Sequence, residues 1–359
     1  MNIEDLLIPA PHIKCEDWQL GSHIKGEVLP GGIALIFCSD ERGAGRSSKY
    51  NDFEKTRMEL YALSKQDWNV PVSDLGDFIS GKTVQDTHFA LQEILSYCFK
   101  LEAIPVVIGG SNSLAHALFM ASRQVVEDLQ YVQVSHILHL KNQGEQINDK
   151  NFLAKIFEVE NQPLSDYCHL GLQIHANNEE VIQLMKEVDF EVVRLAQMVN
   201  SPEDMEPYFR HADMVTFNCD AVESFADSFS LHPQVNGLNR REICTFTKEA
   251  GLSERLKTVG IFNFDFQSKN RLNHQLLAQM IWYLIDGINI RKSHPTKKNL
   301  ETFWVMHEGR ELAFLRDTFT NLWYFGNSEE LSECVPCAKQ DYENAKEGKL
   351  SKRILNHIS

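Results

Sequence analysis

The stretch MVTFNCDAVES (residues 214–224) decides the fold, together with IPVVIGGSNSLAHAL (104–118) and YVQVSHILHLK (131–141). Each begins with a short run of mostly apolar residues and continues directly into polar residues or glycine. Runs of this length, bounded by polar residues, are typical of buried strands. We therefore expect three strands of one sheet, each followed by a polar turn.

Strand-like segments alternate with helix-like segments along most of the chain. GGIALIFCS (31–39) precedes the helix-like FEKTRMELYAL (53–63), and AIPVVIGG (103–110) precedes SLAHALFMASRQVV (113–126). Alternating strands and helices predict an α/β fold with a mainly parallel sheet covered on both faces. We count at least seven strands. Further strands are expected at 131–136, 167–173, 191–194, 214–219 and 258–263, and helices near 179–186, 240–250 and 273–288.

The amino-acid composition and net charge indicate which kinds of binding partner to expect. The chain has 359 residues, of which 43% are hydrophobic, so it can bury a sizeable core, and its formal charge is −15. That charge repels polyanions, so nucleic acid and an anionic membrane are not expected as main partners. An unknown small molecule or another protein is the expected partner. The acidic amino terminus does not resemble a secretory signal, and eight scattered cysteines are too few for a disulfide framework, so we expect a cytoplasmic protein.

The basic segment IRKSHPTKKN (290–299) reads as a linker, so we divide the chain into a domain of residues 1–292 and an extension of residues 293–359 packed on it. Within the extension, residues 311–327 suggest two strands or a hairpin around Asp317, and residues 341–348 suggest a helix. Cys334 and Cys337 form a single Cys-x-x-Cys pair. No second cysteine pair or His-x-x-x-His motif accompanies them, so a structural role is expected rather than a metal or redox function.

The three opening stretches, in their order and spacing, resemble the ureohydrolase family of arginases, agmatinases and formimidoylglutamases. The resemblance covers roughly residues 30 to 290 and is best with the formimidoylglutamase branch. Residues 37–60, 167–193, 232–251 and 259–285 also carry it. It implies a three-layer α/β/α sandwich with a site at the carboxyl ends of the strands, two manganese ions held by six ligands, and a homo-oligomer.

Most of the implied ligands are replaced in this chain. The family's histidine after Gly-Gly falls at Asn112, and its two aspartates on a later strand fall at Asn218 and Asp220. Its Asp-x-His-x-Asp pattern best matches Ile137, His139 and Lys141, which we expect on one face of a strand because alternate residues of a strand share a face. One histidine and one carboxylate remain. We therefore describe these six positions as vestigial and expect no metal cofactor, with manganese only if the site proves functional.

Lys141 adds to this loss. An ammonium about 4 Å from a divalent ion costs roughly 8 kcal/mol at an effective dielectric constant near 20, so we expect Lys141 to replace a cation and pair with Asp220. If one metal is retained, His139 and Asp220 are its expected ligands, with Asn112 or Asn218. A register shifted by three would instead place His136 at the histidine position, a poorer match. His136 otherwise faces away from His139.

Other positions have both a functional and a structural interpretation. By resemblance, Asp40 and Arg46 line the pocket, or else they belong to a solvated loop. The family's carboxylate on the last strand falls at Phe262 or Asn263, and we include Asn263 in the possible pocket. Residues 111–113 can serve simply to cap the helix that follows.

These observations leave three hypotheses. The first is a non-catalytic ureohydrolase relative, a pseudoenzyme that acts through binding or assembly, so that no residue is assigned a catalytic role. The alternative is a hydrolase of linear amidines, like formimidoylglutamase, agmatinase or arginase, with a rearranged or single-metal site. The third is a metal-free enzyme that uses a buried Lys141 as base or Schiff-base amine.

Overall fold

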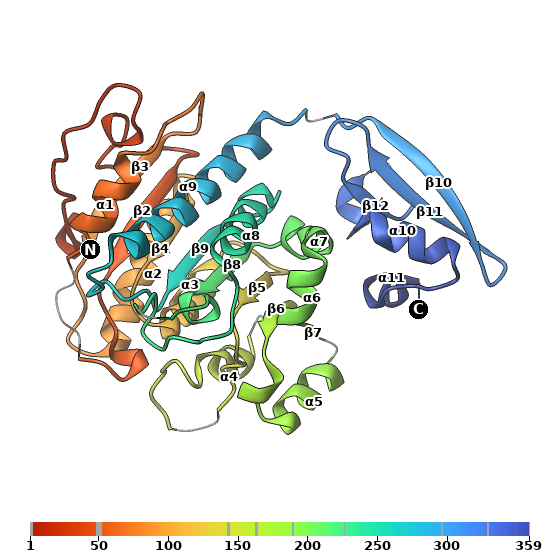
Figure 1. The fold of residues 1–359 in the computed structure, drawn as a ribbon, viewed down its shortest axis with the longest axis horizontal. Coiled ribbons are helices and arrows are strands. Elements are labelled where there is room, and N and C mark those ends of the chain that lie inside the picture. The colour runs from red at the N-terminus through yellow and green to blue at the C-terminus, as the bar shows by residue number, and fades with distance from the viewer. Residues whose placement is uncertain are drawn as a thin grey trace.

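The structure, a computed structural model, describes residues 3–47, 52–141, 144–161, 164–188, 190–225, 227–295, 297–328 and 330–358. Within these ranges no helix is both long and apolar enough to span a bilayer. The described chain forms two sheets, a large one built by residues up to 262 and a small one built from residue 300 onward (Figure 1).

The large sheet has nine described strands in the order β1-β3-β2-β4-β9-β8-β5-β6-β7. All pairs are parallel except the first, in which β1 runs antiparallel to β3. This confirms the predicted mainly parallel sheet. The strands are β1 (Leu7–Ile8), β2 (Ile33–Cys38), β3 (Val72–Phe78), β4 (Ile104–Ile108), β5 (Gln130–Val134), β6 (Asp166–Leu172), β7 (Glu191–Arg194), β8 (Met214–Asn218) and β9 (Thr258–Phe262).

Helices cover both faces of this sheet, because its strands are apolar on both sides. In β2, Ile33, Leu35 and Phe37 join one hydrophobic core, while Ala34, Ile36 and Cys38 join the other. The first core is closed by α1 (Glu54–Tyr61), α6 (Leu195–Asn200), α7 (Glu206–Arg210), α8 (Arg240–Leu252) and α9 (Arg271–Ser293). The second is closed by α2 (Val84–Lys100), α3 (Ala115–Ser122), α4 (Phe152–Phe157) and α5 (Glu179–Glu187). The expected three-layer α/β/α sandwich is therefore present.

The strand β3 was not predicted from the sequence. The β3 sequence VSDLGDF carries two aspartates and a glycine, which are uncommon inside strands, yet every residue of it is buried. The aspartates are tolerated because Arg57 of α1 donates to Asp74 at 2.8 and 3.0 Å and to Asp77 at 2.5 Å. A buried ion pair between two elements thus replaces the apolar contacts that the pattern would require.

The small sheet is antiparallel and has the order β10-β11-β12-β13 in the described chain. Its elements are β10 (Leu300–His307), β11 (Arg310–Asp317), β12 (Trp323–Phe325), β13 (Val335–Cys337), α10 (Lys339–Lys346) and α11 (Lys352–Ile358). The turn between β11 and β12 begins at Asp317, as the sequence suggested, and α10 matches the expected helix closely. The strands β10 and β13 were not anticipated.

Arg210 of α7 joins the small sheet to the large one. Its guanidinium donates to the carbonyls of Trp323, at 2.5 Å, and Cys337, at 3.4 Å, and lies 4.6 Å from the ring centroid of Tyr324. Cys334 and Cys337 are buried free thiols. Burial raises the pKa of both thiols, which lowers their reactivity. The division of the chain at residue 292 stays a prediction.

Candidate functional site at the carboxyl ends of the strands

Four neighbouring strands, β4, β9, β8 and β5, end at one edge of the large sheet. The chain leaves β4 through Gly109 and Gly110, whose φ angles are +87° and +72°. A side chain at Gly109 would place its Cβ 2.5 Å from the ring of Phe266. Only glycine fits this turn without displacement, and the turn carries Asn112 back toward the end of β9.

Asn263, the first residue after β9, is the centre of the polar contacts at this edge. Its side-chain nitrogen Nδ2 donates to Oδ2 of Asp149 at 2.9 Å and to Oδ2 of Asp220 at 2.7 Å. Its Oδ1 accepts the backbone N–H of Asn112 at 3.2 Å, which fixes the orientation of the amide. Asn263 has φ +60°, a left-handed conformation that asparagine tolerates better than most residues. The amide therefore links two carboxylates across the site.

Asp149 and Asp220, here called the carboxylate pair, are both buried, with 7% and 2% of their surface exposed. The second oxygen of each also accepts a backbone N–H, from Ser113 to Asp149 and from His232 to Asp220, both at 2.9 Å. Burial raises the pKa of Asp149 to about 6, although the N–H donors partly offset the effect. Burial also raises the pKa of Asp220. The pair is thus held by neutral donors rather than by a cationic side chain.

Asn218 and Asp220 lie close together, but not as alternate residues of one strand. Asn218 is the last residue of β8, and Asp220 lies in the following turn, η7 (Cys219–Ala221). The Asn218 Oδ1 accepts the backbone N–H of Asp220 at 2.8 Å, and its Nδ2 contacts Ser135 Oγ at 3.3 Å. Asn218 therefore shapes the turn that presents Asp220, while Asp220 itself faces Asn263.

The expected arrangement of Ile137, His139 and Lys141 is wrong, because β5 ends at Val134 and the alternation of a strand no longer applies beyond it. His139 is buried, and both its ring nitrogens are engaged, Nδ1 with the carbonyl of Asp149 and Nε2 with Ser135 Oγ. Burial lowers the pKa of His139 to about 3, so the ring is neutral.

Lys141 does not pair with Asp220. Its side chain is exposed, and the described residues include no ion pair between the two. The expectation failed because the chain has turned away from the sheet before residue 141. An exposed lysine also lacks the burial that the Schiff-base hypothesis requires.

His136 was expected to face away from His139, but both histidines line the same cavity because the chain bends after β5. This strand-end cavity has a volume of about 590 Å³. His136 is 5% exposed, burial lowers its pKa to about 4, and its Nδ1 has no partner among the described residues. The cavity is lined by Arg42, Gly43, Ala44, Gly45, His136, Ile137, His139, Asn148, Asp149, Lys150, Asp220, His232 and Asn263.

Residues 111–113 do not cap the following helix through a side chain. Ser111 Oγ contacts Ser113 Oγ at 2.7 Å instead, so the capping interpretation is wrong. The side chain of Asn112 is 1% exposed, and neither its Oδ1 nor its Nδ2 finds a partner among the described residues. Buried amides without partners are uncommon and indicate a place that a water or ligand could satisfy.

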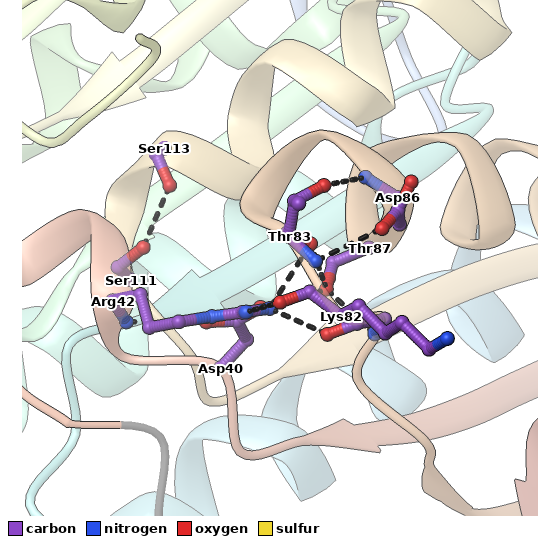
Figure 2. A network of polar contacts seen from close by, with 9 residues as sticks. Asp40, Arg42, Lys82, Thr83, Asp86, Thr87, Ser111 and Ser113 are labelled. Atoms are coloured by element: carbon purple, nitrogen blue, oxygen red, sulfur yellow. Dashed lines mark hydrogen bonds and ion pairs between the residues drawn. The ribbon is translucent and has the colours of Figure 1, made fainter.

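Asp40 is buried beside the site but does not line the cavity. Arg42 donates to it at 2.9 and 2.5 Å, and Thr87 Oγ1 donates at 2.8 Å (Figure 2). These contacts hold the pKa of Asp40 below its usual range despite burial. The same Arg42 donates to the carbonyl of Lys82 at 2.7 Å (Figure 2). The network therefore anchors the loop after β2 to the start of α2.

Of the three residues expected in the pocket, only Asn263 lines the cavity. Arg46 turns to the carbonyl of Leu231, to which its Nη2 donates at 2.6 Å. Asp149 was missed because it lies in an irregular loop, where no periodic pattern marks it. Its backbone N–H donates to the carbonyl of Gly43 at 3.0 Å, and this tertiary contact brings the loop to the site.

Several solved structures share this fold. The formiminoglutamase of Trypanosoma cruzi with Mn²⁺ has a TM-score of 0.67 at 16% identity, covering 77% of this chain and 100% of that one. The formimidoylglutamase of Bacillus subtilis has a TM-score of 0.63 at 14% identity, covering 81% and 92%. The agmatine ureohydrolase of Thermoplasma volcanium has a TM-score of 0.60 at 13% identity, covering 78% and 97%. By contrast, no protein-family model and no curated protein matches the sequence.

The donors at the strand ends do not fit two manganese ions. No group of three or more histidine, cysteine, aspartate or glutamate side chains in the described ranges is arranged to hold a metal. The ring nitrogens of His139 are both used, and the two carboxylates share the amide of Asn263. The chain has the fold of the formiminoglutamases and agmatine ureohydrolases.

Proposed function

We propose that this chain is a ureohydrolase relative without two-manganese catalysis, and that it acts by binding a small polar molecule in the strand-end cavity. The order of the segments along the sequence and the shared fold support the relationship. A cytoplasmic location and a homo-oligomer belong to the same proposal. Size-exclusion chromatography with light scattering tests the oligomer.

One observation carries the proposal. The Asn263 amide donates to both members of the carboxylate pair, at 2.9 and 2.7 Å. A divalent ion bound between these carboxylates would meet the N–H group of this amide, which presents positive partial charge and no lone pair. Metal binding would therefore require the Asn263 side chain to leave and its hydrogen bonds to break.

The remaining cavity is suited to binding a polar ligand. About 590 Å³ lies within the range of small-molecule sites, and its wall combines the carboxylate pair with the neutral rings of His136 and His139. The unpartnered His136 Nδ1 offers a further polar contact on that wall. Because the pKa of Asp149 is raised to about 6, this carboxyl group changes its protonation state near neutral pH. We therefore expect ligand binding in this cavity to depend on pH.

The test combines metal analysis with activity. The purified protein is incubated with Mn²⁺, dialysed, analysed for bound metal and assayed with formimidoylglutamate, agmatine and arginine. We expect no stoichiometric manganese and no hydrolysis. Tight stoichiometric manganese with turnover of any of the three substrates would overturn the proposal.

A hydrolase with a rearranged or single-metal site is the second candidate. The observation that favours it is a cavity lined by two carboxylates, in a fold shared with a Mn²⁺-containing formiminoglutamase. This candidate predicts that Asp220→Ala and His139→Ala each abolish turnover while circular dichroism stays unchanged. Turnover that survives both substitutions would rule it out.

A further inference from the structure

The second notable cavity lies where α9 ends and the small sheet begins. It has a volume of about 830 Å³ and shares no lining residue with the strand-end cavity. Figure 1 shows α9 leading from the large sheet toward β10 at this junction. We call it the basic cavity, and its lining comprises Glu254, Arg291, Lys292, His294, Pro295, Lys297, Lys298, Leu300 and Leu331.

The charge of the basic cavity is opposite to that of the whole chain. Arg291, Lys292, Lys297 and Lys298 supply four positive charges, whereas Glu254 supplies the only carboxylate of the lining. The complete chain carries a formal charge of −15. Four cations around one cavity of an acidic protein repel one another, and a bound anion would relieve that repulsion.

Nearby carboxylates offset part of this charge: Glu254 acts on Arg291, Glu102 on Lys292 and Asp317 on Lys298. Among the described residues, however, only one ion pair involves these cations. Glu254 lies 3.6 Å from Lys298, while Arg291 and Lys292 donate to the neutral backbone carbonyls of Ser253 and Gly31. No described carboxylate forms an ion pair with Arg291, Lys292 or Lys297.

The pKa values of Arg291, which is partly buried, and of the exposed Lys292 agree with this. Burial lowers the pKa of Arg291, and burial together with repulsion from Arg291 lowers the pKa of Lys292. A neighbouring anion would raise both. The pKa of His294 is also lowered, by burial and by the charge of Lys298.

We propose that the basic cavity binds a small multivalent oxyanion, such as a compound with two adjacent phosphate groups. Its size is that of a small-molecule site, and its cations come from the end of α9 and from the connection to β10. Leu331 of η8 (Leu331–Glu333), in the connection between β12 and β13, also lines the cavity. A bound anion would therefore also hold the small sheet against α9. This proposal does not depend on the function of the strand-end cavity.

The test is calorimetric titration of the full-length protein with pyrophosphate at pH 7.5 in 150 mM NaCl. We expect one saturable site per chain. Lys297→Gln combined with Lys298→Gln should weaken binding at least about tenfold, since charge-assisted hydrogen bonds are lost. Glu254→Gln should tighten binding, because it removes the one carboxylate of the cavity lining. The matched control is Lys346→Gln with Lys349→Gln, two exposed lysines elsewhere that should leave binding unchanged.

The outcomes separate specific binding from general attraction. Absence of saturable binding by the wild-type protein would overturn the proposal, as would equal weakening in the control or unchanged binding in the Lys297 and Lys298 variant. Thermal denaturation without ligand checks that each variant is folded. If the double variant is unstable, Lys297→Gln alone gives the same test, because Lys297 is exposed and forms no ion pair with the described residues.

Discussion

Asn263→Asp should destabilise the protein strongly at neutral pH. It replaces a donor that faces two buried carboxylates with a third carboxyl group. The new oxygen would lie near the present Nδ2 position, 2.7 Å from Asp220 and 2.9 Å from Asp149. Two ionised oxygens about 2.8 Å apart repel by about 6 kcal/mol at an effective dielectric constant near 20, so the new group would remain protonated.

Keeping that group protonated sets the size of the effect. Holding a carboxyl of usual pKa about 4 in its neutral form costs about 4 kcal/mol at pH 7 and only about 1 to 2 kcal/mol at pH 5. The folded variant then binds one more proton than the unfolded chain, so its stability falls as the pH rises. We expect the loss in free energy of unfolding, relative to wild type, to grow by about 2 to 3 kcal/mol from pH 5 to pH 7.

Urea denaturation followed by tryptophan fluorescence at pH 5, 6 and 7 measures this difference. Asn69→Asp, at an exposed asparagine, is the matched control and should change stability little at any of these pH values. An Asn263→Asp protein that is as stable as wild type at pH 7 would refute the reasoning. A loss that does not depend on pH would also refute it, because the effect would then be one of shape rather than charge.

Three further predictions follow from other buried groups. Because the pKa of Asp149 is raised to about 6, its contribution to the free energy of unfolding is fully present below pH 4 and is lost as the pH rises to about 6. The loss amounts to up to about 3 kcal/mol. Asp149→Asn should reduce this decline, measured by urea denaturation, and an unchanged decline would contradict the assignment. Arg57→Met should cost about 3 to 5 kcal/mol, since it leaves the carboxylate of Asp74 buried without a cation; a loss below about 1 kcal/mol would contradict it. Arg210→Met should increase amide hydrogen exchange in β12 and β13 while the large sheet stays protected, because two carbonyls of the small sheet lose their donor; equal exchange in wild type and variant would show that other contacts hold this sheet.

Much of the large sheet could be predicted because its signal is local. The β8 sequence MVTFN and the β9 sequence TVGIF are short, apolar and followed by polar turns, so their ends were placed within a residue or so. The strand β3 was not predicted, because its aspartates are compatible with burial only through Arg57, which lies in α1. No period in the sequence encodes such a pairing.

The site was harder to predict for the same reason. Asn263 directly follows β9 and Asp220 lies two residues beyond β8, so both could be placed near strand ends from the sequence. His139 and Lys141 could not be oriented, because β5 stops at Val134 and the chain then bends. Asp149 reaches the site through an irregular loop whose path depends on tertiary contacts.

The central claim is that a neutral amide, rather than a metal, joins the carboxylate pair. The most direct test is a crystal soaked in Mn²⁺ and measured at the manganese absorption edge. We predict no anomalous peak between Asp149 and Asp220, and an Asn263 side chain that still contacts both. An anomalous peak at that place with Asn263 displaced would contradict the account.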